Sequence, residues 1–70
     1  MDKLLAKYAR IREQMPKGMN LKVFFLPFLV KYGSDILSSA LTKAIKKGAE
    51  IKRPDMYWQV SCENLKKELG

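Results

Sequence analysis

The residues best suited to chemistry share one face of a helix predicted over residues 34–47. This face carries hydroxyl groups in its first half and lysines in its second half: Ser38, Ser39, Thr42, Lys43, Lys46 and Lys47. Short hydroxyl side chains can hydrogen-bond to base edges or phosphates, and lysines neutralise phosphate charge. The pattern suits a helix that lies in the major groove of DNA. The alternative is an ordinary solvated helix face, because the same residue types are common there.

The helix that must position these residues is well specified by the sequence. Its opposite face is apolar and recurs with helical spacing: Ile36, Leu37, Ala40, Leu41, Ala44 and Ile45. Ser34 is placed to cap the N-terminus, and Asp35 suits the positive end of the helix dipole. Gly48 stands where a left-handed residue commonly ends a helix. We therefore predict a helix with one buried face.

A basic hairpin is predicted directly after this helix. Residues 49–53 and 56–60 form two short, partly alternating runs, and Arg53-Pro54-Asp55-Met56 between them has the composition of a β-turn. The alternation directs Ile51, Trp58 and Val60 inward and Tyr57 outward. Lys52 and Arg53 would then lie at the tip, where they could contact a polyanion.

A first helix is predicted over residues 3–15. Asp2 can cap it, and Pro16 and Gly18 end it. Its apolar residues recur on one side, and they are Leu4, Leu5, Tyr8, Ile11 and Met15. Its charged residues and Gln14 fall outside this stripe, so we expect a packing helix with a basic outer face.

Residues 19–33 are the most hydrophobic part of the chain and allow two interpretations. Asn20 can cap a helix whose buried side would comprise Phe24, Phe25, Phe28, Leu29 and Tyr32. Pro27 opposes an uninterrupted helix, because proline lacks an N–H and clashes with the preceding turn. Either the helix breaks at Pro27, which we favour, or residues 21–26 are extended and Pro27 begins a short helix.

A closing helix is predicted over residues 62–69. Ser61 can cap it, and Leu65 and Leu69 supply its apolar contact. Cys62 at its start is expected to be a small buried residue, because the sequence offers it neither a second cysteine nor a histidine base.

The composition excludes several classes of function. Seventy residues correspond to a single domain, 1–70, and an apolar fraction of 47% is enough to build a small core. The chain has no histidine and one cysteine, so we expect no metal site, no cofactor and no imidazole-dependent catalysis. The charged first twenty residues do not resemble a signal peptide, and Lys22 and Lys31 interrupt the longest apolar run.

Positive charge is concentrated in two parts of the chain. The net charge is +7, and residues 1–18 hold five bases and two acids. Residues 43–53 hold five bases and one acid, whereas residues 54–70 hold two bases and three acids. Clustered basic residues are typical of proteins that bind polyanions.

The run KGAEIKRPDMYWQVSCENLKKEL, residues 47–69, resembles the C-terminal part of small excisionase-type and MerR-like DNA-binding domains. In that family a recognition helix ends in Lys-Gly or a similar pair. A wing follows with an aromatic-x-hydrophobic strand, here Trp58-Gln59-Val60, and a Ser-x-Glu-x-Leu pattern opens a helix, here Ser61, Glu63 and Leu65. The resemblance covers about a third of the chain.

The resemblance implies a mostly α-helical, winged helix-turn-helix-like domain with a small β-hairpin: three helices, a wing and a short C-terminal helix. It implies that the polar face between Ser38 and Lys43 meets the major groove. Lys46 and Lys47 would contact phosphates. Lys52 and Arg53 would reach the backbone or the adjacent minor groove through the wing.

We therefore expect a small, cytoplasmic, non-enzymatic DNA-binding protein, with double-stranded DNA as its partner and a homodimer or cooperative assembly on DNA. Its expected role is as a transcriptional regulator or recombination-directionality factor of a phage or mobile element. The first alternative is a phage-type inhibitor that binds a host protein, which would be favoured if two of Phe24, Phe25 and Phe28 were exposed together. The second is a membrane-active basic peptide, although the capped helices argue against a membrane partner.

Overall fold

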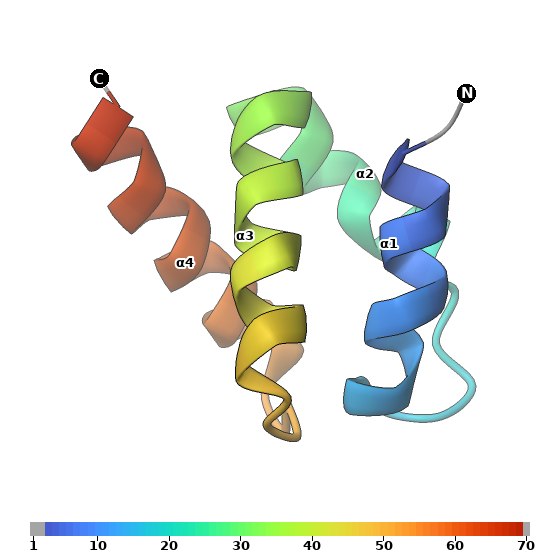
Figure 1. The fold of residues 1–70 in the computed structure, drawn as a ribbon. Helices are drawn as coiled ribbons and strands as arrows, with labels where there is room; N and C mark the ends of the chain where they lie inside the picture. Colours follow the sequence, from blue (N-terminus) through green and yellow to red (C-terminus); the bar gives the residue numbers. More distant parts are fainter. Residues whose placement is uncertain (1–2, 70) are drawn as a thin grey trace.

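The chain folds into helices that surround one central helix. The computed structural model describes residues 3–69, and in this part of the chain it contains no β-strand. Its elements are α1 (Lys3–Ile11), the 3-10 turn η1 (Arg12–Gln14), α2 (Leu21–Tyr32), α3 (Ser34–Lys47) and α4 (Pro54–Leu69). α3 packs against all three other α-helices, with α1 and α4 on its two sides and α2 behind it (Figure 1).

The predicted hairpin, and with it the winged helix-turn-helix fold, is wrong. Residues 48–53 form a loop, and α4 begins at Pro54 and includes the whole of the supposed second strand. Pro54 occupies the first helical position and Asp55 its first turn, which suits a helix start as well as it suits a β-turn. Val60, expected to face inward, is exposed, because the residues that α4 buries recur with helical spacing: Trp58, Cys62 and Leu65.

The predicted closing helix is therefore only the second half of α4. Ser61, expected to cap it, lies inside α4 and is half-buried. Leu65 is buried as expected, but Leu69 is exposed at the end of the helix. A sixteen-residue helix gives the C-terminal part of the chain a longer buried face than a hairpin and a two-turn helix would.

The first helix is shorter than predicted. Its α-helical part ends at Ile11, and η1 carries the chain to Met15, which is extended. Asp2, the expected cap, lies outside the described residues. Tyr8, Ile11 and Met15 are buried as predicted, whereas Leu5 is exposed on the side of α1 that faces the loop before α2.

α2 runs through Pro27 as one α-helix, so neither the predicted break nor an extended segment is present. The side chain of Asn20 caps it as predicted by accepting a hydrogen bond from the Val23 N–H at 3.3 Å. Because Pro27 has no N–H, the carbonyl four residues earlier, that of Val23, has no backbone donor from this position. Pro27 and Val23 are both exposed, so neither the ring nor this carbonyl disturbs the core.

Phe25 of α2 lies at the centre of the core. Its ring stacks on Tyr8 of α1 with the centroids 4.9 Å apart, and it meets Trp58 of α4 edge-on at 5.0 Å. Trp58 is fully buried, as predicted, and its Nε1–H donates to Met15 Sδ at 3.3 Å. These contacts join α1, α2 and α4 behind α3, which leaves the outer side of α3 at the surface.

None of the described helices is long and apolar enough to cross a membrane.

Candidate nucleic-acid interface

The two ends of α3 differ in how they are capped. The N-terminal cap is Gly33, with φ 93° and no side-chain hydrogen bond, so the expected cap by Ser34 is wrong and Ser34 is the first helical residue. The C-terminal expectation is confirmed: Gly48 is left-handed with φ 70°, and its N–H donates to the Ala44 carbonyl at 3.0 Å. The C-terminal end of α3 is therefore fixed by its own backbone.

The hydroxyl groups of α3 are less available than the sequence predicts. Ser38, Ser39 and Thr42 are all half-buried, because α1 and α4 lie on either side of α3. The Thr42 hydroxyl donates to the Ser38 carbonyl at 3.0 Å, so its donor is already used within the helix. The predicted base-reading half of the face consequently offers few free donors.

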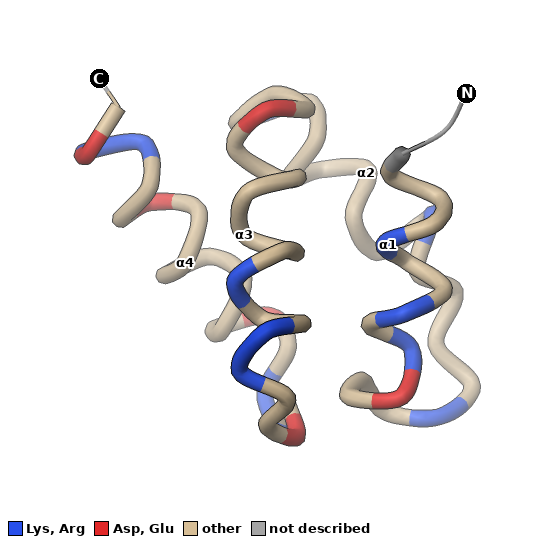
Figure 2. Tube along the Cα trace, in the orientation of Figure 1, with Lys and Arg blue, Asp and Glu red and all other residues tan. Residues whose placement is uncertain are grey.

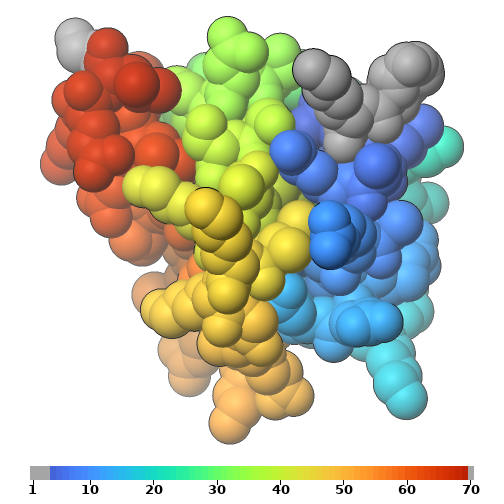
Figure 3. Space-filling view, viewed as in Figure 1, coloured from blue at the N-terminus to red at the C-terminus, as the bar shows by residue number. Residues whose placement is uncertain are grey.

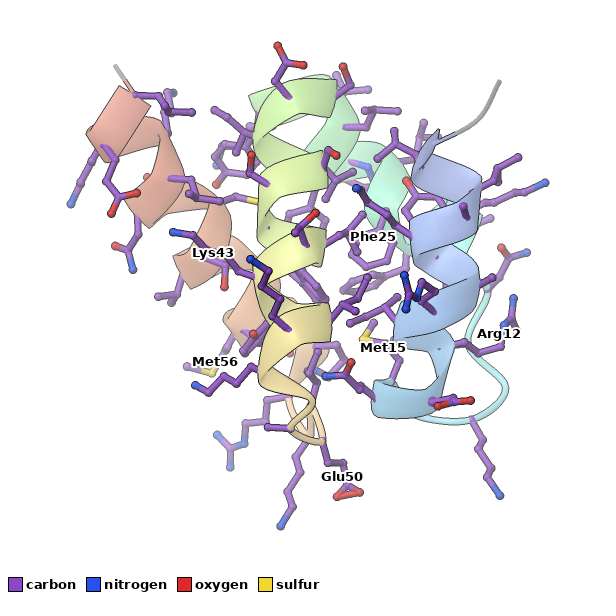
Figure 4. The ribbon with its side chains drawn as sticks, viewed as in Figure 1. Arg12, Met15, Phe25, Lys43, Glu50 and Met56 are labelled. Atoms are coloured by element: carbon purple, nitrogen blue, oxygen red, sulfur yellow. The ribbon has the colours of Figure 1, made fainter. Side chains whose placement is uncertain are left out.

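Lys43 projects from the front of α3 and points away from the core (Figure 4). Its Nζ lies 3.7 Å from Glu68 Oε2 of α4, and both side chains are 65% exposed. Ion pairs this exposed contribute at most about 1 kcal/mol and weaken with salt. Lys43 is therefore held loosely toward α4.

The remaining predicted cations lie at one end of the molecule. Lys46 and Lys47 end α3, and Lys52 and Arg53 follow in the loop that leads to α4; all four are exposed. Arg12 and Lys17, on the connection between α1 and α2, line the same surface hollow as Lys52. We call this set the basic end, and it comprises Arg12, Lys17, Lys46, Lys47, Lys52 and Arg53 (Figure 2).

Three acids accompany the basic end. Glu13 and Glu50 line the hollow between the loop after η1 and the loop after α3, and Met15 and Ile51 lie beside them. Figure 4 shows Glu50 at the tip of this end and Arg12 on the neighbouring turn. Asp55, exposed in the first turn of α4, is the third acid. Six cations against three carboxylates still leave an excess of positive charge at this end, which favours an anionic partner.

The loop that carries Lys52 and Arg53 is held in place by Gln14. The side-chain amide of Gln14 donates to the Ala44 carbonyl at 2.9 Å and to the Ala49 carbonyl at 2.8 Å. The backbone carbonyl of Gln14 accepts from the Ile51 N–H at 2.8 Å, and Ile51 is buried. Two of these hydrogen bonds tie the loop to η1, and the third ties the last turn of α3 to the same residue.

Sequence reasoning missed Arg12, Lys17 and Gln14 as parts of this site. The two cations belong to the basic residues 1–18, but only the packing of α1 on α3 brings them beside residues 46–53. In the space-filling view the C-terminal half of α3 and the loop after it project between α4 and α1 (Figure 3).

The groups with perturbed pKa values lie elsewhere. Burial raises the pKa of the Cys62 thiol to about 11, so this thiol is a poor nucleophile. The Tyr32 hydroxyl donates to Glu63 Oε2 at 2.6 Å. This bond lowers the pKa of Glu63 and raises that of Tyr32 to about 12. Both residues connect α2 to α4 and stabilise the fold.

Within residues 3–69 no group of three or more His, Cys, Asp or Glu side chains is arranged to hold a metal ion. No buried side-chain nitrogen or oxygen in the same part of the chain lacks a hydrogen-bond partner. No family model matches the chain, and no curated protein or solved structure is significantly similar to it.

Proposed function

We propose that this chain is a small, non-enzymatic protein that binds double-stranded DNA through its basic end. The observation that carries the proposal is the convergence of six exposed cations from three separate segments: η1, the loop before α2, and residues 46–53. Lysine and arginine side chains that neutralise phosphates release condensed counterions, which supplies most of the affinity of such contacts.

The loop that carries Lys52 and Arg53 is ordered in the free protein, which supports its role as a binding site. The hydrogen bonds of Gln14 order residues 48–53 before any ligand arrives. A pre-ordered loop loses less conformational entropy on binding than a flexible one. The left-handed Gly48 similarly fixes the end of α3 directly after Lys46 and Lys47, and with it the direction of the following loop.

Duplex DNA fits the basic end better than a single strand does. Proteins that bind single strands stack bases on exposed aromatic rings. Of the two aromatic residues nearest the loop, Trp58 is buried and cannot stack on a base, and Tyr57 is half-buried at the edge of a surface hollow that Lys52 and Arg53 also line. One partly buried ring is a poor platform for successive bases. Contacts to a duplex backbone need cations alone.

The proposal gives α3 a smaller part in sequence recognition than a recognition helix would have. The half-buried Ser38 and Ser39 and the internally bonded Thr42 offer little base readout, so affinity comes mainly from phosphates. We propose a cytoplasmic protein with modest specificity, serving transcription regulation or recombination directionality in a phage or mobile element. Self-association on DNA would increase the specificity of such a small surface.

Salt-dependent fluorescence anisotropy with a labelled duplex tests the proposal. Six phosphate contacts predict a slope of about −5 in log affinity against log salt. The double variant Lys46→Ala/Lys47→Ala should reduce the magnitude of this slope by about 2.

The matched control is Lys66→Ala/Lys67→Ala, which removes an equivalent exposed pair from the last turn of α4. It should leave the slope unchanged, because these lysines lie outside the basic end. An equal loss from both pairs, or no binding at about 50 mM salt, would refute binding through the basic end.

A further inference from the structure

α2 presents an apolar stripe to solvent on the side opposite its core face. Leu21, Phe25 and Tyr32 are buried, while the outer side carries four apolar residues at i, i+3, i+4 and i+7. Val23 is 65% exposed, Leu26 55% and Val30 79%, and Pro27 lies exposed between them. We call Val23, Leu26, Pro27 and Val30 the outer stripe. It covers two turns of α2, and none of the other described elements covers it.

All charged residues of α2 are positive, and they lie beside the outer stripe. The sequence of α2 contains no acid, and its two lysines, Lys22 and Lys31, are exposed on opposite flanks of the stripe. Lys31 Nζ lies 5.3 Å from the centroid of the Tyr32 ring, close to Glu63 of α4. Glu63 already accepts the hydrogen bond of Tyr32. A partner that matches this surface must therefore be apolar opposite the outer stripe and negatively charged opposite Lys22 and Lys31.

A second copy of the chain does not supply that complement. Two facing α2 helices contain no acid that could pair with their lysines, and both copies carry a net charge of +7. Four side chains on a three-turn helix also cover only a fraction of the roughly 800 Å² per partner that a stable interface buries. The composition differs from that of a protein-binding hot spot as well, because those are enriched in Trp, Tyr and Arg and poor in Leu and Val.

Aliphatic residues flanked by lysines are typical of helices that lie in the surface of a bilayer. Lysine stems can extend along the apolar region while the ammonium groups reach lipid phosphates. Twelve residues of helix measure about 18 Å, which is too short to span the hydrocarbon core but long enough to lie along its surface.

We propose that the outer stripe docks the folded protein on an anionic lipid surface, with Val23, Leu26 and Val30 inserted between headgroups and Lys22 and Lys31 bound to lipid phosphates. This goes beyond DNA binding and revises the expectation that no membrane is a partner. It also differs from a peptide that folds on lipid, because the core around Phe25 is complete without lipid. The proposal rests on α2 alone and is independent of the basic end.

Vesicle co-sedimentation provides the first test. The probe is vesicles of phosphatidylcholine and phosphatidylglycerol at about 2:1, compared with phosphatidylcholine alone. The wild-type chain should bind the anionic vesicles, and Val23→Thr/Leu26→Gln/Val30→Thr should bind at least about tenfold more weakly. All three positions are exposed, so the variant should retain its thermal unfolding midpoint and its DNA affinity.

Charge variants separate the outer stripe from the basic end. Lys22→Gln/Lys31→Gln should weaken vesicle binding by about 30-fold, since each lysine near an anionic surface contributes about a factor of five. Lys66→Gln/Lys67→Gln, the matched pair on α4, should weaken it far less. If Lys46→Gln/Lys47→Gln weakens binding most, the vesicles bind the basic end and the proposal is wrong.

A fluorophore reports the orientation of the bound protein. An environment-sensitive dye on Val30→Cys should shift to the blue and become protected from aqueous quenchers when anionic vesicles are added, whereas the same dye on Ser39→Cys of α3 should not. The buried Cys62 will not compete for the label. No spectral shift at residue 30, no vesicle binding, or dimers in sedimentation velocity that the triple variant abolishes would each overturn the proposal.

Discussion

The side-chain amide of Gln14 donates to the Ala44 carbonyl at 2.9 Å, although thirty residues separate the two in sequence. Ala44 belongs to the last turn of α3, and its carbonyl also accepts the hydrogen bond from the N–H of Gly48, so it has two donors. Gln14 thus caps a helix of which it is not part, and its second bond, to the Ala49 carbonyl, extends the cap into the following loop. One side chain thus connects two of the three segments that form the basic end, η1 and residues 46–53.

Gln14→Ala should lower the free energy of unfolding by about 1 kcal/mol, because it removes two hydrogen bonds, of which the one to Ala44 is partly buried and the one to Ala49 is exposed. It should also weaken duplex binding a few-fold by loosening residues 48–53. Urea unfolding and anisotropy measure the two effects. Gln59→Ala, at an exposed position of α4, is the control and should change neither. Equal stabilities of the two variants would show that the Gln14 bonds do not hold the loop.

Pro27→Ala should stabilise the chain. Pro27 lies inside α2, where it removes one backbone hydrogen bond, and its side chain is exposed, so alanine loses little packing. The greater freedom of alanine in the unfolded chain offsets part of this gain, which leaves about 1–2 kcal/mol. Thermal and urea unfolding measure the change. A destabilised variant would mean that Pro27 imposes a bend that the core requires.

Tyr32→Phe should destabilise the fold most in the middle of the pH range. The bond from Tyr32 lowers the pKa of Glu63, so the stability that Glu63 contributes is present above the ordinary carboxyl pKa and is lost as pH falls through its lowered value. The pKa of Tyr32 is raised to about 12, so its contribution is present below about 10 and lost as pH rises toward 12.

The stability difference between the wild type and Tyr32→Phe should therefore form a plateau between these limits and shrink on both sides. Urea unfolding as a function of pH measures it. Phenylalanine keeps the aromatic ring near Lys31, so the comparison isolates the hydroxyl group. A difference that does not vary between pH 3 and 7 would contradict the link to Glu63.

Cys62 should react with a thiol reagent only when the chain unfolds. It is fully buried, and burial raises its pKa to about 11, so at pH 8 both access and thiolate content are low. We expect labelling at least about a hundredfold slower than that of an unfolded peptide thiol, and a rate that rises with urea in parallel with global unfolding. Rapid labelling of the native chain would show that α4 detaches from the core.

The sequence was sufficient to predict α3 because each of its signals is local. A single apolar face, Asp35 in the first turn and Gly48 after the last all act within the helix. Its buried residues Leu37, Ala40, Leu41 and Ala44 were all predicted for the apolar face. The cap at Ser34 failed, because Gly33, with its positive φ, takes the cap position one residue earlier.

The hairpin failed because the same residues satisfy two local patterns. Pro54 and Asp55 can occupy a β-turn or begin a helix. Trp58 and Val60 are two residues apart, which is the spacing of two side chains on the same face of a β-strand. The burial of Trp58, Cys62 and Leu65 on one face decides for the helix, because it completes a core around Phe25 that a short strand pair would leave open.

The candidate site was only partly predictable. Lys46, Lys47, Lys52 and Arg53 are exposed, as expected from the charge pattern. Their association with Arg12 and Lys17 depends on the packing of α1 against α3 and on the bonds of Gln14, which no local pattern encodes. The partial burial of Ser38, Ser39 and Thr42 is likewise a tertiary effect, caused by the neighbouring helices.

Amide chemical shifts of the ¹⁵N-labelled chain, followed during titration with a short duplex, test the central claim most directly. Binding through the basic end predicts that the largest shifts fall on residues 12–17 and 46–53 and that they fade as salt is raised. Shifts confined to α2, or none at a saturating excess of duplex, would contradict DNA binding through the basic end.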